Sequence, residues 1–320
     1  MEDLIAEDGQ RSARLTEGKT VKEYAKAAAV DEETGPVFAE RSAVVSDAPN
    51  IPEPSFWGVR VKKDYDLREL FSYINETALF KNQWQLKTAS QEDYLRLVEE
   101  KYRPIKKSLE DEVVGSGLFE PRVVYGYFPA QGDGNDVVVY APDGATRAEA
   151  PALHELLRFT FPRQREGRRL CISDFFAPKS SGKVDVLGLS LVTIGPKASV
   201  ETQRLFEGGE YTKYLYLHGL SVETAEALAE FHHRLMRQEL GISGEDSPHI
   251  RDLFHQKYRG SRYSFGYPAC PNLEDQAKLF ALLKPEENVG VRLTSGFLLE
   301  PEQSTSAIVV HHPAAKYFVV

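Results

Sequence analysis

A predicted β-hairpin at residues 123–141 restricts the fold of this 320-residue chain more than any other feature. Two apolar runs, VVYGYF and DVVVYA, flank the segment PAQGDGN, whose Asp-Gly pair signals a tight turn between antiparallel strands. Elsewhere, predicted helices and strands do not alternate regularly as they do in a doubly wound nucleotide-binding fold. The sequence therefore predicts an α+β fold with an antiparallel-rich sheet flanked by helices.

Apolar spacing and turn residues predict the other elements. Asp66 is placed as the N-cap or first-turn acid of a helix, and Ser221 as the cap of a helix that ends at Gly241. Further helices are predicted at 91–113 with an interruption near Pro104, at 148–159, at 199–216 with a break at Gly208-Gly209, at 248–258 and at 274–283. Strands are predicted at 56–61, 170–178, 185–195, 289–301 and 305–320.

The first 52 residues differ from the rest of the chain. Residues 46–54, reading SDAPNIPEP, are rich in turn formers and predict a linker. We therefore expect residues 1–52 to be a linker or accessory segment with a short helix at 22–29. Residues 53–320 are expected to form the compact domain.

Composition excludes several classes of function. The net charge of −9 argues against nucleic-acid binding, which requires a basic face. Cys171 and Cys270 form no CxxC pair, so neither a disulfide framework nor a zinc site is expected, and a cytoplasmic location is predicted. No apolar run is long enough for a membrane span. The sequence also lacks GxxxxGK[ST], HExxH and GxSxG signatures.

The segment RYSFGYPACP, at residues 262–271, combines features of a rigid loop with a charged group. Pro268 and Pro271 fix the backbone, and Gly266 permits a left-handed conformation or a close backbone approach. Arg262 has a planar guanidinium suited to a carboxylate or phosphate. An ordinary proline-bounded loop with a surface arginine is the alternative interpretation.

Several acidic, histidine and cysteine residues could take part in catalysis or metal binding, but each also fits a structural role. Glu226 and Glu230 lie four residues apart on one predicted helix, where they fit either a solvated edge or an acidic groove wall. Adjacent histidines at 232–233 and 311–312 point in different directions on a helix or strand, which disfavours a metal site. Cys270 has no local base and is expected to be a buried structural thiol.

The same segments together resemble a known family. RYSFGYPACPNLED at 262–275 resembles the RxxxGYPACP signature of the activation domain of cobalamin-dependent methionine synthase. Four further segments are similar to family segments in the same order: DYDLRELF at 64–71, the 170–195 region, AEALAEFHHRLMR at 225–237 and HHPAAKYFVV at 311–320. The resemblance covers residues 52–320 and implies a single C-shaped domain that binds S-adenosylmethionine.

The resemblance also implies roles for individual residues. Arg262 would hold the ligand carboxylate, and Ser264 would lie where the loop backbone meets the adenine end. The remaining implied contacts are Asp66, Glu226, Gly266, Tyr267, Tyr317 and Phe318. Acids and aromatic faces at these positions suit the ammonium and sulfonium cations. Phe318 replaces a tyrosine of the family, and Phe265 occupies a position that often holds proline.

In this family, the domain supports reductive methylation of inactive cob(II)alamin to methylcobalamin. The resemblance therefore implies two partners: a cobalamin-binding domain and a flavodoxin-type or other electron donor. The family's cobalamin-binding pattern DxHxxG is absent, so the cofactor is expected on the partner domain. A non-catalytic S-adenosylmethionine sensor or scaffold is the alternative function.

Overall fold

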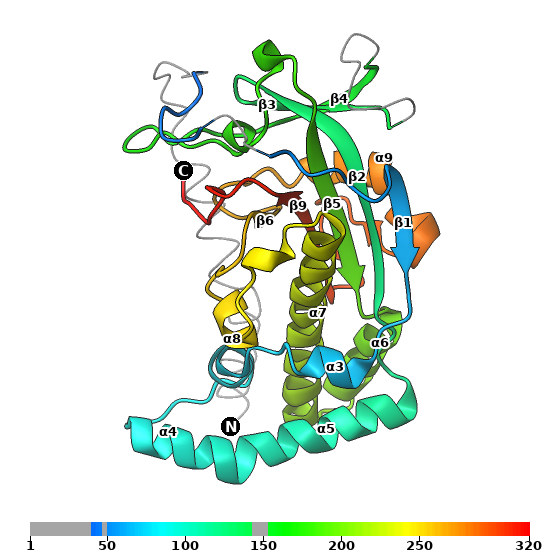
Figure 1. The fold of residues 1–320 in the computed structure, drawn as a ribbon. Helices are drawn as coiled ribbons and strands as arrows, with labels where there is room; N and C mark the ends of the chain where they lie inside the picture. The colour runs from blue at the N-terminus through cyan, green and yellow to red at the C-terminus, as the bar shows by residue number, and fades with distance from the viewer. Residues whose placement is uncertain (1–39, 47–49, 143–152) are drawn as a thin grey trace.

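The computed structural model describes residues 40–46, 50–142 and 153–320. In Figure 1 an antiparallel sheet forms the upper half of the molecule, and helices α4 and α5 form the base. The long helix α7 (Tyr211–Glu239) runs between the two halves. The predicted α+β class is thus confirmed, while the C-shaped outline stays a prediction. The helix predicted at 22–29 lies outside the described residues.

The main sheet has seven strands in the order β4-β3-β2-β5-β9-β6, and β1 also pairs with β2. Every strand pair is antiparallel, and β1 and β3 follow one another along the same edge of β2. The strands are β1 (Gly58–Lys62), β2 (Arg122–Asp133), β3 (Asp136–Tyr140), β4 (Glu155–Thr160), β5 (Asp185–Thr193), β6 (Ser261–Ser264) and β9 (Ser304–Val310). A separate short ladder joins β7 (Arg292–Leu293) to β8 (Leu299–Glu300).

The helices lie on both faces of the sheet and below it. Besides α7 they are α3 (Leu67–Phe71), α4 (Gln91–Leu97), α5 (Arg103–Ser116), α6 (Pro196–Glu207), α8 (Ile250–Leu253), α9 (Asp275–Leu283) and α10 (Pro285–Val289). A π-helical stretch, Val98–Tyr102, joins α4 to α5 before Pro104, where the interruption was predicted. No helix of the described segments is both long and apolar enough to cross a membrane.

Side-chain alternation on the central strands builds two cores. On β2, Tyr125 and Tyr127 pack toward α7, whereas Val124 and Phe128 join the core that contains α9. At Gly188 on β5, an added Cβ would lie 2.9 Å from Val309 Cβ of β9 and 3.0 Å from Met236 Cε of α7, so the glycine leaves room for both side chains. The sheet therefore sets the position of α7, which carries several residues of the candidate site.

Two predicted elements are wrong at the β4 edge and in the following segment. The helix predicted at 148–159 ends instead in β4, whose Phe159 is buried and pairs with Val137 of β3; residues 148–152 lie outside the described part. The strand predicted at 170–178 is a 3₁₀ turn, Ile172–Phe175. Cross-strand pairing outweighed helical spacing in the first case, and polar contacts fixed the turn in the second.

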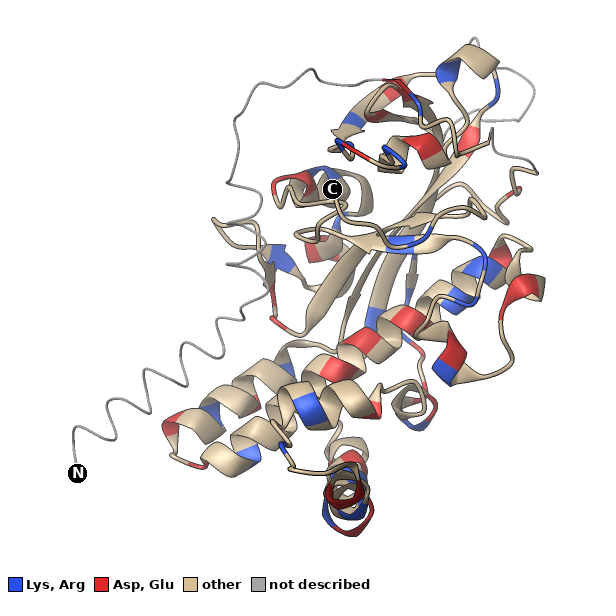
Figure 2. Cartoon of the chain, turned by 90° about the vertical axis from the view of Figure 1, so that its left-hand side faces the viewer, with Lys and Arg blue, Asp and Glu red and all other residues tan. Residues whose placement is uncertain are grey.

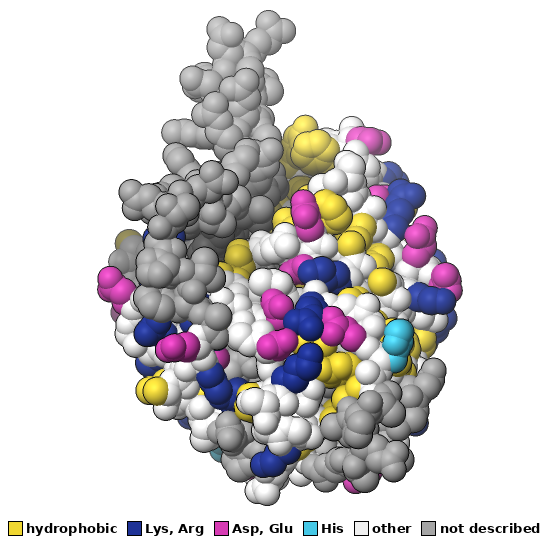
Figure 3. All heavy atoms as spheres, turned by 90° about the horizontal axis from the view of Figure 1, so that it is seen from above, with side chains coloured by type: hydrophobic (Ala, Val, Ile, Leu, Met, Phe, Trp, Pro, Cys, Tyr) yellow, Lys and Arg dark blue, Asp and Glu magenta, His cyan; other side chains and the backbone are white. Residues whose placement is uncertain are grey.

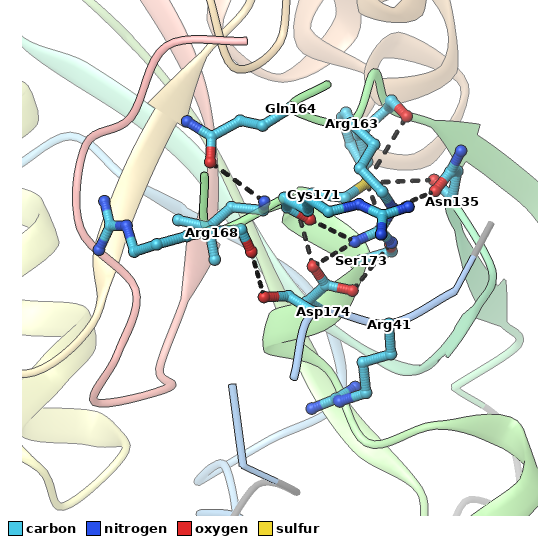
Figure 4. Close-up of polar contacts among 12 residues, drawn as sticks. Arg41, Asn135, Arg163, Gln164, Arg168, Cys171, Ser173 and Asp174 are labelled. Atoms are coloured by element: carbon cyan, nitrogen blue, oxygen red, sulfur yellow. Dashed lines mark hydrogen bonds and ion pairs between the residues drawn. The ribbon is translucent and has the colours of Figure 1, made fainter. Parts of the chain in front are cut away.

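Those polar contacts form a buried cluster (Figure 4). Arg163 donates to both carboxylate oxygens of Asp174, at 2.6 and 2.9 Å, and to the side chain of Asn135 at 2.8 Å. The Ser173 hydroxyl donates to the Gly134 carbonyl at 2.8 Å. The side chains of Arg163 and Asp174 are 3% and 1% exposed. This cluster ties the turn of the predicted hairpin to the 3₁₀ turn, so we assign it a structural role.

Helix α7 also begins earlier than predicted. Ser221 lies inside the helix, where its hydroxyl donates to the His218 carbonyl at 2.7 Å, and is not an N-cap. Glycine is unfavourable inside a helix, but at position 219 a Cβ would lie only 2.7 Å from Trp84 Cδ1, so the packing against Trp84 requires a glycine there. The predicted break at Gly208-Gly209 is confirmed, since α6 ends at Glu207 and α7 starts at Tyr211.

Two segments near the end of the chain contain less regular structure than predicted. The helix predicted at 248–258 contains only α8, a single turn. The strand predicted at 305–320 ends with β9 at Val310. Pro313 lacks a backbone N–H, and Ala315 N–H donates to the His312 carbonyl, so the chain turns there. Residues 311–320 therefore leave the sheet and run along its end.

Charged residues of both signs are interspersed along the described helices, strands and loops (Figure 2). Seen from above, basic and acidic groups lie next to one another (Figure 3). At the β3–β4 end, Arg158 is within 3.4 Å of Asp133, Asp136 and Glu155. These exposed pairs largely neutralise each other and contribute little to stability.

Candidate functional site

A pocket of about 380 Å³ lies where α7, β6 with its following loop, and the C-terminal segment meet. This volume falls within the roughly 300–1,000 Å³ typical of small-molecule sites. The lining includes five of the eight residues implied by the resemblance: Glu226, Arg262, Ser264, Tyr267 and Tyr317. The structure thus brings together residues up to 91 positions apart in the sequence.

Arg262 is held by the edge strand β6, where it pairs with Val309 of β9. Its Nη2 lies 3.4 Å from Glu226 Oε2, and its Nε lies 3.7 Å from Glu230 Oε2. Burial alone would lower the pKa of Arg262, but the two carboxylates raise it above its usual value. The guanidinium therefore remains charged inside the pocket, where it suits an anionic ligand group.

Helix α7 contributes three carboxylates to the lining. Glu223, Glu226 and Glu230 lie three and four residues apart, so they share one face of the helix. Glu226 is 46% exposed, whereas Glu230 is 8% exposed at its side chain. Burial raises the pKa of Glu223 to about 7, although a hydrogen bond from Gln83 opposes this. Burial also raises the pKa of Glu230, and Arg262 opposes it.

The loop after β6 has a conformation that requires glycine. Gly266 has a φ of +84°, and a Cβ there would lie 2.9 Å from Leu273 Cδ2. Its N–H donates to the Cys270 carbonyl at 2.9 Å, and Cys270 N–H donates to the Tyr267 carbonyl at 2.8 Å. The resulting turn presents Tyr267, 51% exposed, at the pocket.

Cys270 is 1% exposed, and burial raises its pKa well above the usual range. Its thiol is therefore held neutral, as expected of a structural cysteine.

The C-terminal segment supplies Tyr317. Lys316 donates to the carbonyls of Gln256 and Tyr258, and Tyr317 N–H donates to the Gln256 side chain at 3.0 Å. Tyr317 is 49% exposed and lines the pocket, while Phe318 is 4% exposed and packs in the core. The two neighbouring side chains thus lie in different surroundings, and neither residue belongs to a strand.

Three residues implied by the resemblance are not in the lining. Asp66 is exposed and caps α3, accepting a hydrogen bond from Arg68 N–H at 2.8 Å. Gly266 acts through the shape of the loop, and Phe318 through the core behind Tyr317. A direct ligand contact by any of these three stays a prediction.

Sequence reasoning missed several lining residues. Tyr73 and Asn75 lie between α3 and the π-helical stretch Ala78–Gln83, and Ala78 begins that stretch; this region carried no recognisable signal. Glu223 could have been found, because it continues the helical spacing of Glu226 and Glu230. Within the described ranges, no group of three or more His, Cys, Asp or Glu side chains could hold a metal ion.

Comparison with known proteins places the chain in a family. Residues 66–320 match the family described as "Vitamin B12 dependent methionine synthase, activation domain". The chain belongs to this family, which is the one its sequence resembles.

Its relatives include two mycobacterial proteins. Methionine synthase of Mycobacterium tuberculosis (strain ATCC 25618 / H37Rv) is 41% identical over 327 residues, and that of Mycobacterium leprae (strain TN) is 40% identical over 325 residues. These alignments cover 98% and 97% of this chain but 26% of each relative, so the chain spans about a quarter of their length. A crystal structure of the MetH reactivation domain bound to AdoHcy has a TM-score of 0.74 and 26% identity, covering 85% of this chain and 83% of that one.

Proposed function

We propose that the pocket binds S-adenosylmethionine and presents its methyl group to a cobalamin carried by another domain. The observation that carries this proposal is the charged guanidinium of Arg262, held at one pocket wall beside the carboxylates of Glu226 and Glu230. Such a site suits a ligand that is at once carboxylate, ammonium and sulfonium. The AdoHcy bound to the structural neighbour supports a ligand of this class.

The described residues suit binding and orientation. In the proposed reaction, cob(II)alamin takes up one electron and the sulfonium methyl group to give methylcobalamin, and S-adenosylhomocysteine leaves. No proton has to be removed from a nucleophile, so no general base is required. The contribution of this chain is to orient the methyl group, with Arg262 at the carboxylate, Glu226 near the cations, and Tyr267 and Tyr317 at the mouth.

Several associated assignments are part of the same proposal. Residues 53–320 would act as the binding domain and residues 1–52 as a linker or accessory segment, although Val45 already packs in the core. The partners would be a cobalamin-binding domain and a flavodoxin-type or other electron donor, in the cytoplasm. Ser264 would meet the adenine end through its backbone.

Calorimetry with S-adenosylmethionine tests the site. Arg262→Ala should weaken binding by about 2–4 kcal/mol, because a charged hydrogen-bonding partner is lost. Arg262→Lys is the matched control for charge, since it keeps the cation but loses the planar fork. Unchanged affinity in Arg262→Ala would refute the site assignment.

A second experiment separates the proposed function from the sensor or scaffold alternative. The chain is mixed with a cob(II)alamin-loaded domain, a reductant and S-adenosylmethionine, and methylcobalamin is followed by its absorption spectrum. Formation of methylcobalamin only when all components are present supports methyl transfer. Ligand binding without methylcobalamin formation would favour a binding-only module.

A further inference from the structure

Glu230 differs from the other acidic residues of the pocket in its surroundings. It lines the pocket but is only 6% exposed, and its Oε1 has no hydrogen-bond partner within the described residues. A buried carboxylate is costly unless it is paired, and the nearest cation is Arg262, with Nε at 3.7 Å from Glu230 Oε2. The ion pair with Arg262 is therefore the interaction that offsets the cost of burying the Glu230 carboxylate.

Glu226 contacts the same guanidinium from a more accessible position. Its Oε2 lies 3.4 Å from Nη2 of Arg262, and its side chain is 46% exposed against 8% for Glu230. Both distances exceed the roughly 2.7–2.9 Å of a strong charge-assisted hydrogen bond. Arg262 is thus neutralised by two loose contacts, and the accessible one lies on a terminal nitrogen that an incoming carboxylate would approach.

We propose that Glu230 is a positioning residue that fixes Arg262 at Nε, while Glu226 is an exchangeable partner that the ligand carboxylate displaces. This inference rests on the proposed function of the pocket. The ligand carboxylate replaces Glu226 at the terminal nitrogens, so Arg262 remains neutralised throughout. The released Glu226 then faces the cationic part of the ligand. No unpaired charge is created in the pocket at any stage of this exchange.

Three ligands separate these two roles. S-adenosylmethionine has an amino-acid group and a sulfonium, S-adenosylhomocysteine has the amino-acid group and a neutral thioether, and 5′-methylthioadenosine lacks the amino-acid group. Glu230→Gln should weaken the first two ligands to a similar extent, by roughly tenfold to a hundredfold, because both need a correctly oriented Arg262. It should leave 5′-methylthioadenosine within about twofold of wild type, since that ligand has no carboxylate.

Glu226→Gln is the matched comparison on the same helix face. It should weaken S-adenosylmethionine more than S-adenosylhomocysteine, because only the former has a sulfonium. Dissociation constants are measured by calorimetry, after an unfolding curve has been recorded for each variant. If Glu230→Gln does not fold, Glu230→Asp, which keeps the charge but withdraws it from Nε, should show the same ligand pattern with a smaller loss.

Equal losses for all three ligands in a folded Glu230 variant would mean a general structural role and would overturn the inference. So would unchanged affinity for S-adenosylmethionine. Failure of the wild-type chain to bind any of the three ligands would instead overturn the proposed function.

Discussion

Glu223 provides a test of whether burial in the pocket wall destabilises the charged form of a carboxyl group. The residue is 7% exposed, and burial raises the pKa of its carboxyl from 4.5 to about 7. Below pH 4.5 it is protonated in both the folded and the unfolded state and contributes nothing to pH dependence. Between pH 4.5 and about 7, only the folded state keeps the proton, so the free energy of unfolding falls as pH rises. Above about pH 7 the penalty is constant.

Replacing Glu223 by Gln removes this penalty. A tenfold change in acid constant corresponds to about 1.4 kcal/mol, so the penalty above pH 7 is on the order of 3 kcal/mol. Glu223→Gln should therefore be more stable than wild type by up to this amount at pH 8, and nearly equal to it close to pH 4.5. Urea denaturation at pH 5 and pH 8 measures the difference.

The exposed Glu112 on α5 serves as the control for the same substitution. Glu112→Gln should change stability by less than about 0.5 kcal/mol at either pH. If Glu223→Gln shows the same small and pH-independent effect as Glu112→Gln, the charge of Glu223 is not destabilised by its surroundings, and the argument from burial is refuted.

Two further predictions concern the loop and α7. Gly266→Ala should lower the free energy of unfolding by about 1–3 kcal/mol, because both its left-handed backbone and the contact with Leu273 oppose a Cβ. Gly209, with a φ of +73° and no atom within 4 Å of an added Cβ, is the control, and Gly209→Ala should destabilise the fold less. Equal losses in the two variants would contradict the role of Leu273. Burial lowers the pKa of His232 to about 3, so only the unfolded state gains this proton below pH 6.5 and acid weakens the fold. His232→Asn, which can keep a contact with Tyr65, should reduce the slope of stability against pH by about 1.4 kcal/mol per pH unit at pH 4–6, and an unchanged slope would contradict this account.

Local signals predicted those parts of the fold that local chemistry controls. The hairpin at 123–141 and the N-cap at Asp66 needed only turn chemistry and helical spacing, and both are present. Ser221 misled because its residue type suits a cap, whereas the choice between cap and helix interior depended on the packing of Gly219 against Trp84. Such contacts join residues more than a hundred positions apart and leave no local trace.

In the candidate site, too, some features are recognisable from the local sequence and others depend on the fold. Arg262 and the loop around Gly266 were recognisable because proline and glycine restrict the backbone locally. The pairing of Arg262 with Glu230 was not, because it depends on the distance between β6 and α7, which the sheet and its cores determine. Spacing on the helix shows only that Glu223, Glu226 and Glu230 share a face, and not which of them is buried.

The position of Asp66 affects how the acidic residues share the proposed ligand. Asp66 accepts the Arg68 N–H as the cap of α3, and giving up such a cap typically costs about 1 kcal/mol. A ligand cation that recruited Asp66 would have to compensate for this loss or share the carboxylate with the cap. Release of Glu226 would carry no comparable cost in the proposed exchange, because the ligand carboxylate would replace it as the partner of Arg262. Under the proposed exchange, Glu226 is therefore the acid that the ligand cation would engage first, whereas a contact with Asp66 would compete with the cap of α3.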